Sequence, residues 1–145
     1  MTDIAVSNFQ KKVPVRISVV SANVHKAVKA LKFAPPFLSV AFVGEQRMRR
    51  LNRAYLGHDY VTDVLTFGKR QGDGLRRPPD TSPFCEIVVC PAAAKRNAKQ
   101  YGNSVEREMM LYVVHGILHL CGYDDHSSAD IKRMRQKEQQ IMDLP

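Results

Sequence analysis

The sequence has few cysteines, no long apolar stretch and no recognisable export segment. Its apolar runs are only a few residues long, which is too short for a membrane-spanning helix. The first residues contain no basic stretch followed by an apolar run, so we expect no signal peptide. The three cysteines, Cys85, Cys90 and Cys121, are an odd number. We therefore expect free thiols in a reducing compartment rather than a disulfide framework.

The composition is that of one globular domain with a basic surface. The chain has 145 residues, of which 44% are hydrophobic and 25% are charged, and this is enough to bury a core. Because we find no internal repeat, we treat residues 1–145 as a single domain. The net charge is +8, from 22 basic and 14 acidic side chains. Such a charge favours a polyanionic partner, of which nucleic acid is the usual one, although a solvated basic face has the same composition.

Strand-type and helix-type patterns alternate along the chain. Apolar residues at every second position or in short runs predict strands at 3–9, 38–44, 64–67 and 85–90. Apolar residues at helical spacing predict helices at 15–32, about 48–55, 91–101, 104–121 and from Ser127 or Ser128 onward. Residues 68–83 are rich in Pro, Gly and basic side chains and predict a loop. The predicted fold class is α/β (α+β), with a small mixed sheet of about four strands covered by helices.

Potential metal ligands concentrate in the segment 114–126. His115 and His119 are four residues apart on a predicted helix, so both imidazoles lie on one face and can bind one tetrahedral Zn²⁺. Gly122 can end the helix and turn the chain back, and Asp125 and His126 follow it. In metzincin metalloproteases the same order of helix, glycine and third ligand occurs, and the third position corresponds to Asp125. Histidine pairs of this spacing are also common without a metal, but buried imidazoles on so apolar a helix need a polar partner.

The residue after the first histidine argues against a protease. Zinc proteases carry their general base, a glutamate, directly after that histidine, and this sequence has Gly116 there. The metal pattern is complete without it, because zinc itself lowers the pKa of water toward neutrality. The segment therefore predicts a zinc-dependent hydrolase with His115 and His119 at its catalytic centre.

Three blocks of the sequence resemble one protein family. The first block is His115-Gly116-x-Leu118-His119-Leu120-x-Gly122-Tyr123-Asp124. The second is Leu51-Asn52-Arg53-Ala54-Tyr55, followed by Asp59 and by Thr62-Asp63-Val64-Leu65-Thr66-Phe67. The third is Glu86-Ile87-Val88-Val89. Together they resemble the signature of the YbeY family of zinc-dependent endoribonucleases, in the family's order and over residues 37–142.

The resemblance implies a fold, an activity and a set of partners. It implies a single-domain α/β fold with three metal ligands in an open cleft and one Zn²⁺ per chain. The activity implied is hydrolysis of single-stranded RNA by an endoribonuclease, with ribosomal RNA and the small ribosomal subunit as partners. The implied roles are maturation of small-subunit ribosomal RNA and quality control of ribosomes in the bacterial cytoplasm, with no membrane partner.

The third ligand departs from the family pattern. The family has a histidine six residues after its second ligand, and that position is Asp125 here, with His126 one residue later. Either Asp125 replaces the histidine, or the loop has gained a residue and His126 reaches the metal. The unchanged spacing favours Asp125, and a carboxylate is an acceptable zinc ligand.

Two other positions also differ from the family. The family arginine after the tyrosine is Leu56 here, and its loss either lowers the catalytic rate or moves the task of facing phosphate to a nearby cation such as Arg53 or His58. Cys85 replaces a family glycine, and we expect it to narrow the cleft.

Basic residues are expected to hold the RNA backbone. They come from the second helix and the following loop: Arg49, Arg50, Arg53, Lys69, Arg70, Arg76 and Arg77. Tyr55, Phe67 and Tyr123 can stack on unpaired bases, but the core is the more usual place for each. Two other functions stay open. One is a non-catalytic ribosome-associated zinc protein, in which Asp125 and His126 both close the site. The other is a metalloprotease-like zinc hydrolase.

Overall fold

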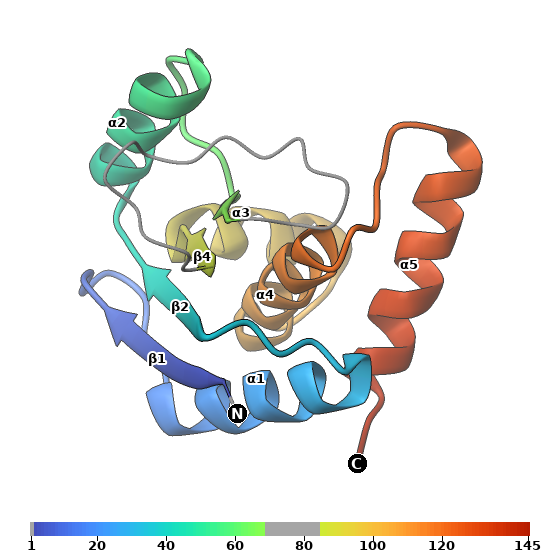
Figure 1. Ribbon diagram of the computed structural model, residues 1–145. Coiled ribbons are helices and arrows are strands. Elements are labelled where there is room, and N and C mark those ends of the chain that lie inside the picture. Colours follow the sequence, from blue (N-terminus) through green and yellow to red (C-terminus); the bar gives the residue numbers. More distant parts are fainter. Residues whose placement is uncertain (1, 69–84) are drawn as a thin grey trace.

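The computed structural model describes residues 2–68 and 85–145, and at their centre is a mixed sheet of four strands (Figure 1). These strands are β1 (Asp3–Asn8), β2 (Phe37–Phe42), β3 (Val64–Phe67) and β4 (Cys85–Val89). Their order across the sheet is β1-β2-β4-β3. The first three in this order run parallel to one another, and β3 runs antiparallel to β4. The predicted α/β fold with a small mixed sheet is confirmed.

The helices lie close to the predicted ranges. They are α1 (Ile17–Leu31), α2 (Glu45–Leu56), α3 (Pro91–Tyr101), α4 (Val105–Leu120) and α5 (Ser128–Met142). The strand predicted at 38–44 ends at Phe42, because Gly44 is already the N-cap of α2. The loop predicted at 68–83 lies outside the described residues except for Gly68. No helix in the described ranges has the length and apolar character needed to cross a bilayer.

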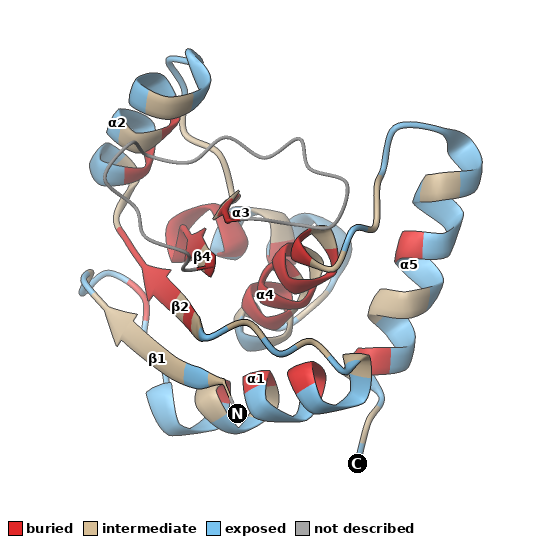
Figure 2. Cartoon of the chain, viewed as in Figure 1, coloured by how far each residue is buried: buried red, intermediate tan, exposed pale blue. Residues whose placement is uncertain are grey.

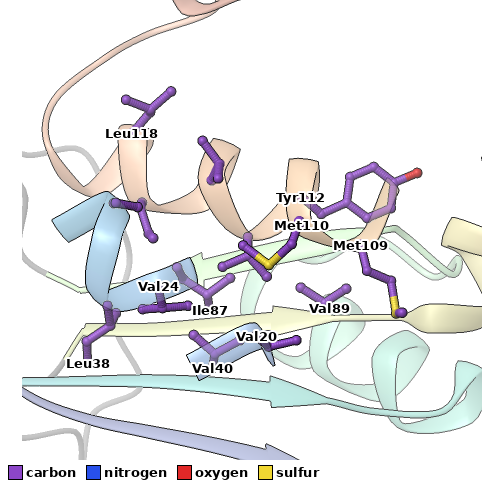
Figure 3. Packing of buried hydrophobic residues seen from close by; sticks show 14 of the residues in the cluster. Val20, Val24, Leu38, Val40, Ile87, Val89, Met109, Met110, Tyr112 and Leu118 are labelled. Carbon is purple, nitrogen blue, oxygen red and sulfur yellow. The ribbon is translucent and has the colours of Figure 1, made fainter. Parts of the chain in front are cut away.

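The main core lies between one face of the sheet and the helices α1 and α4. Figure 3 shows Val24 of α1, Val40 of β2, Ile87 of β4 and Leu118 of α4 in this core, and all four side chains are fully buried. Burial of this many aliphatic side chains is the main stabilising term of the fold. Met134 of α5 joins the same cluster, so the last helix is attached to the body of the protein through its own apolar residues.

Helix α4 is the most deeply buried helix of the described chain (Figure 2). It contacts β3, β4, α1, α3 and α5, which explains why its sequence is apolar almost all the way round. His115 and His119 are among its few residues that are only partly buried. The two histidines are therefore held by a rigid, well-packed helix, yet they reach the surface.

Helix α2 packs against the opposite face of the sheet through Met48. Met48 of α2 packs there in a second cluster with Val43, Leu65, Phe67 and Val88. Since α4 packs on the first face, the sheet separates the arginines of α2 from the main core beneath α4.

Two serine caps and one glycine set the ends of the helices around the histidines. The Ser104 hydroxyl accepts a hydrogen bond from the backbone N–H of Arg107, 3.1 Å away, and so begins α4. After α4, Gly122 adopts a φ of 101°, which glycine tolerates without steric cost, and its N–H donates to the carbonyl of His119. Ser127 then caps α5. The chain thus turns immediately after the second histidine and before the next helix.

Candidate metal centre

The helical spacing of His115 and His119 brings their rings together on one face of α4. The ring centroids are 4.5 Å apart and the rings are nearly perpendicular, at 80°. The two Nε2 atoms are 3.0 Å apart. Both imidazoles therefore direct the same nitrogen toward one point, as two ligands of a single ion do.

The turn at Gly122 brings a carboxylate to the same point. Oδ2 of Asp125 lies 3.7 Å from Nε2 of His115 and 3.6 Å from Nε2 of His119. Among the described residues, these three side chains form a group whose ligand atoms all lie within 4.8 Å of one another. The site is thus built from one helix and the loop that follows it.

The spacing of the three ligand atoms fits a tetrahedral zinc ion. Bonds of about 2.0–2.1 Å in tetrahedral geometry place neighbouring ligand atoms about 3.3 Å apart. The three observed separations are 3.0, 3.6 and 3.7 Å, which bracket this value. Two imidazoles and one carboxylate also form a donor set that zinc accepts in hydrolases, where a fourth position stays open. The residues therefore can hold a metal ion.

His126, the rival third ligand, lies outside this group. Its side chain is 80% exposed, and its Nε2 lies 3.9 Å from Oδ1 of Asp124. Of the two residues that the sequence left as alternatives, Asp125 is the one whose ligand atom lies beside both imidazoles.

Glu138 of α5 is a site residue that the sequence analysis missed. Its Oε2 accepts a hydrogen bond from Nδ1 of His115 at 2.6 Å, and the Glu138 side chain is only 17% exposed. A carboxylate on the far nitrogen of a ligating histidine fixes the ring and its tautomer. The sequence did contain a sign of this contact. Glu138 falls between Met134 and Ile141, the buried apolar residues of the last helix. A carboxylate at such a position needs a buried partner.

The acidic surroundings of His115 change its pKa. Burial alone would lower the pKa of this histidine, but the hydrogen bond and charge of Glu138, together with the charges of Asp125 and Asp63, outweigh it and raise the pKa. The carboxylates thus give the site a negatively charged environment that favours a cation. A metal ion satisfies the same need, since it takes the place of a proton on Nε2 of His115, while the Nδ1 proton stays with Glu138.

His115 lines two clefts. The larger has a volume of about 390 Å³ and the smaller about 260 Å³. His115, Arg135 and Glu138 line both of them. Cys85, expected to narrow the cleft, lines neither and is buried instead in the main core.

The arginines of α2 are not part of this group. Arg49 forms an ion pair with Asp59, with Nε 2.8 Å from Oδ1, and Arg53 lies 3.9 Å from the same oxygen. Arg50 is exposed. The four basic residues expected from the loop, Lys69, Arg70, Arg76 and Arg77, lie outside the described residues.

The other candidate residues discussed from the sequence lie on the surface or in the core rather than at the metal centre. His58 is exposed and packs edge-on against Tyr60, with centroids 5.3 Å apart. Phe67 is buried and Tyr55 packs against it at 5.5 Å, so these two rings belong to the second core cluster. Burial raises the pKa of the Cys121 thiol to about 11. A thiol with so high a pKa is a poor metal ligand at neutral pH.

The sequence is similar to those of known proteins over most of its length. Residues 5–144 match the family model described as Endoribonuclease YbeY. The protein named endoribonuclease YbeY in Pelotomaculum thermopropionicum is 35% identical over 143 residues, which are 96% of this chain and 94% of that protein. Its namesake in Staphylococcus carnosus is 39% identical over 110 residues, or 73% of this chain and 70% of that protein.

A solved structure is also similar to the whole chain. The solution structure of TM1509 from Thermotoga maritima has a TM-score of 0.66 and 29% sequence identity, covering 98% of this chain and 87% of that one. The names of the relatives support a nuclease activity of the hydrolase class. The match of the family model across almost the entire sequence shows that the chain belongs to the endoribonuclease YbeY family.

Proposed function

We propose that this chain is a zinc-dependent endoribonuclease that cuts single-stranded RNA. The observation that carries the proposal is the convergence of His115, His119 and Asp125 within 4.8 Å on a chain of the endoribonuclease YbeY family. Three protein ligands leave a fourth position for water or substrate, as in catalytic rather than structural zinc sites.

Each residue of the centre has a distinct task in this proposal. His115, His119 and Asp125 hold the metal, and Glu138 keeps the proton of His115 on Nδ1 so that Nε2 presents its lone pair. A zinc ion bound there would supply polarisation of a phosphoryl oxygen and activation of water. Gly116 occupies the position at which zinc proteases carry their glutamate base, which favours RNA over peptide as the substrate.

The proposed partners follow from the charge of the chain and from its family. A net charge of +8 favours a polyanion, and RNA is the substrate that the names of the relatives give. We extend the proposal to ribosomal RNA on the small ribosomal subunit, with roles in rRNA maturation and ribosome quality control in the cytoplasm. The basic residues of α2 and of the segment 69–77 would contribute general attraction to the RNA backbone.

A substrate comparison tests the proposal. The zinc-loaded protein is offered a single-stranded RNA, the same RNA in a duplex, and casein. We expect cleavage of the single strand, little cleavage of the duplex and none of casein. His119→Ala should abolish RNA cleavage, whereas His25→Ala, which removes an exposed histidine of α1, should not.

Three results would oppose the proposal. Cleavage of casein would favour the metalloprotease-like hydrolase. Tightly bound zinc without cleavage of any RNA would favour the non-catalytic ribosome-associated protein. Efficient cleavage by a preparation stripped of metal would exclude a metal-dependent mechanism.

A further inference from the structure

The two clefts beside His115 are lined by more acidic than basic side chains. Asp63, Glu108 and Glu138 line the larger cleft, and Asp125 and Glu138 line the smaller. The smaller cleft is lined by two of the three candidate ligands, His115 and Asp125, so a phosphodiester strand that reaches the metal centre through it passes close to carboxylates. Repulsion between like charges in a partly desolvated cleft is costly, so a strand held there needs a cation from the protein besides the metal.

Arg135 is the one arginine or lysine that lines these clefts in the described part of the chain, and it lines both. It lies on α5, three residues before Glu138, so the two side chains lie on neighbouring positions of the same helix face. Arg135 is exposed, and none of the described residues forms an ion pair with it. Its guanidinium therefore has no competing carboxylate partner there, although acidic side chains line the same clefts.

The arginines of α2 are less suited to this task. Arg49 and Arg53 share the carboxylate of Asp59, which offsets part of their charge. They also belong to the helix on the opposite face of the sheet from α4. Neither lines a cleft that contains His115. Their contribution to RNA binding is general attraction rather than a contact beside the metal centre.

We propose that Arg135 binds a phosphate of the RNA strand next to the metal centre. The inference rests on the proposed function, because it takes single-stranded RNA as the ligand. The planar guanidinium donates two parallel hydrogen bonds to a phosphate, which fixes the position of the strand as well as attracting it. Placed between the two clefts, Arg135 holds the backbone where the strand passes from one cleft to the other across His115.

The test compares three variants of the zinc-loaded protein. Arg135→Gln removes both the charge and the planar guanidinium with its paired donors. Arg135→Lys keeps the charge but not the paired donors, and Arg133→Gln is the control. Arg133 lies on the same helix, lines neither cleft and pairs with Asp130, and its removal changes the net charge equally. Binding of a fluorescent single-stranded 2′-O-methyl RNA is measured by anisotropy at several salt concentrations, and zinc content is measured for each variant.

We expect Arg135→Gln to weaken binding about tenfold or more, as loss of a charged hydrogen bond does. The slope of log affinity against log salt should fall by about 0.7, the value for one phosphate contact on a single strand. Arg135→Lys should keep the slope but recover only part of the affinity. Arg133→Gln should match the wild type in affinity and slope, and all the variants should keep their zinc.

The outcomes separate this inference from the proposed function. If the wild type binds the strand and Arg135→Gln binds it equally well with the same slope, the inference is wrong and the proposed function is untouched. An equal loss in Arg133→Gln would also overturn it, because the effect would then be one of net charge. If the wild type binds no single strand, both fail. If it binds but cuts no cleavable RNA, the nuclease proposal fails, and the slopes still decide the role of Arg135.

Discussion

His115 is the residue on which most of the site converges. One ring nitrogen faces His119 and Asp125, and the other bonds to Glu138 on a different helix. The hydrogen bond from Nδ1 to Glu138 restricts rotation of the ring and directs Nε2 toward His119 and Asp125. Preorganisation of this kind lowers the entropic cost of metal binding.

Removal of the Glu138 carboxylate should weaken metal binding without unfolding the protein. We expect Glu138→Gln to lower zinc affinity about tenfold and Glu138→Ala up to about 100-fold, the usual range for such supporting residues. Glutamine is milder because its carbonyl can still accept the hydrogen bond from Nδ1. Competition with a chromogenic zinc chelator measures the change. Asp143→Asn, at the C-cap of the same helix and outside the site, is the control, and an equal loss there would contradict the role of Glu138.

The grouping of the three candidate ligands could be predicted from the sequence, but the contact of Glu138 with His115 could not. His115, His119 and Asp125 lie within eleven consecutive residues, so helix geometry and one glycine turn are enough to bring them together. Glu138 is 23 residues beyond His115 and meets it only through the packing of α5 on α4. Helical periodicity gives the inward face of α5, but not the neighbour that this face contacts.

At the level of elements, α4 determines the site because it packs so closely on the sheet. Gly116, between the two histidines, allows this approach. A Cβ atom there would lie 3.0 Å from methyl groups of both Ile87 and Thr66. The helix that carries the ligands therefore has little room to move relative to β3 and β4.

A methyl group at Gly116 should push α4 away from the sheet. Overpacking typically costs about 1–3 kcal/mol, and the better helix propensity of alanine returns up to about 1 kcal/mol. We expect Gly116→Ala to lower the free energy of unfolding by about 1–2 kcal/mol in urea denaturation. If Gly116→Ala left the free energy of unfolding unchanged or raised it, close packing against Ile87 and Thr66 would not be what this glycine provides.

The order of the sheet is a property of the whole molecule that the sequence analysis did not predict. Short apolar runs in the sequence located each strand but not its neighbours in the sheet. In the structure β4 lies between β2 and β3 and pairs with both. The choice of strand partners depends on contacts between residues far apart in the chain. This strand order places β4, and with it Ile87, against Gly116 in the middle of α4.

The half-buried Glu86 should make stability depend on pH. Burial raises the pKa of this carboxyl group above its usual 4.5, although Arg47 opposes the effect. The stabilisation linked to Glu86 is thus present below its unfolded pKa and is lost as pH rises through the raised value. We expect Glu86→Gln to raise the free energy of unfolding at pH 7, with the gain disappearing toward pH 4. Glu106→Gln, an exposed change of equal charge, should bring no such gain. A gain from Glu86→Gln that stays constant over this range would contradict the assignment.

The central claim concerns the three ligands of one catalytic metal ion. The most direct measurement is zinc content together with cleavage of single-stranded RNA for the wild type, Asp125→Ala and His126→Ala. The account predicts about one zinc ion per chain and active wild type, loss of both in Asp125→Ala, and retention of both in His126→Ala. Loss of zinc and cleavage in His126→Ala, with both retained in Asp125→Ala, would contradict the centre described here.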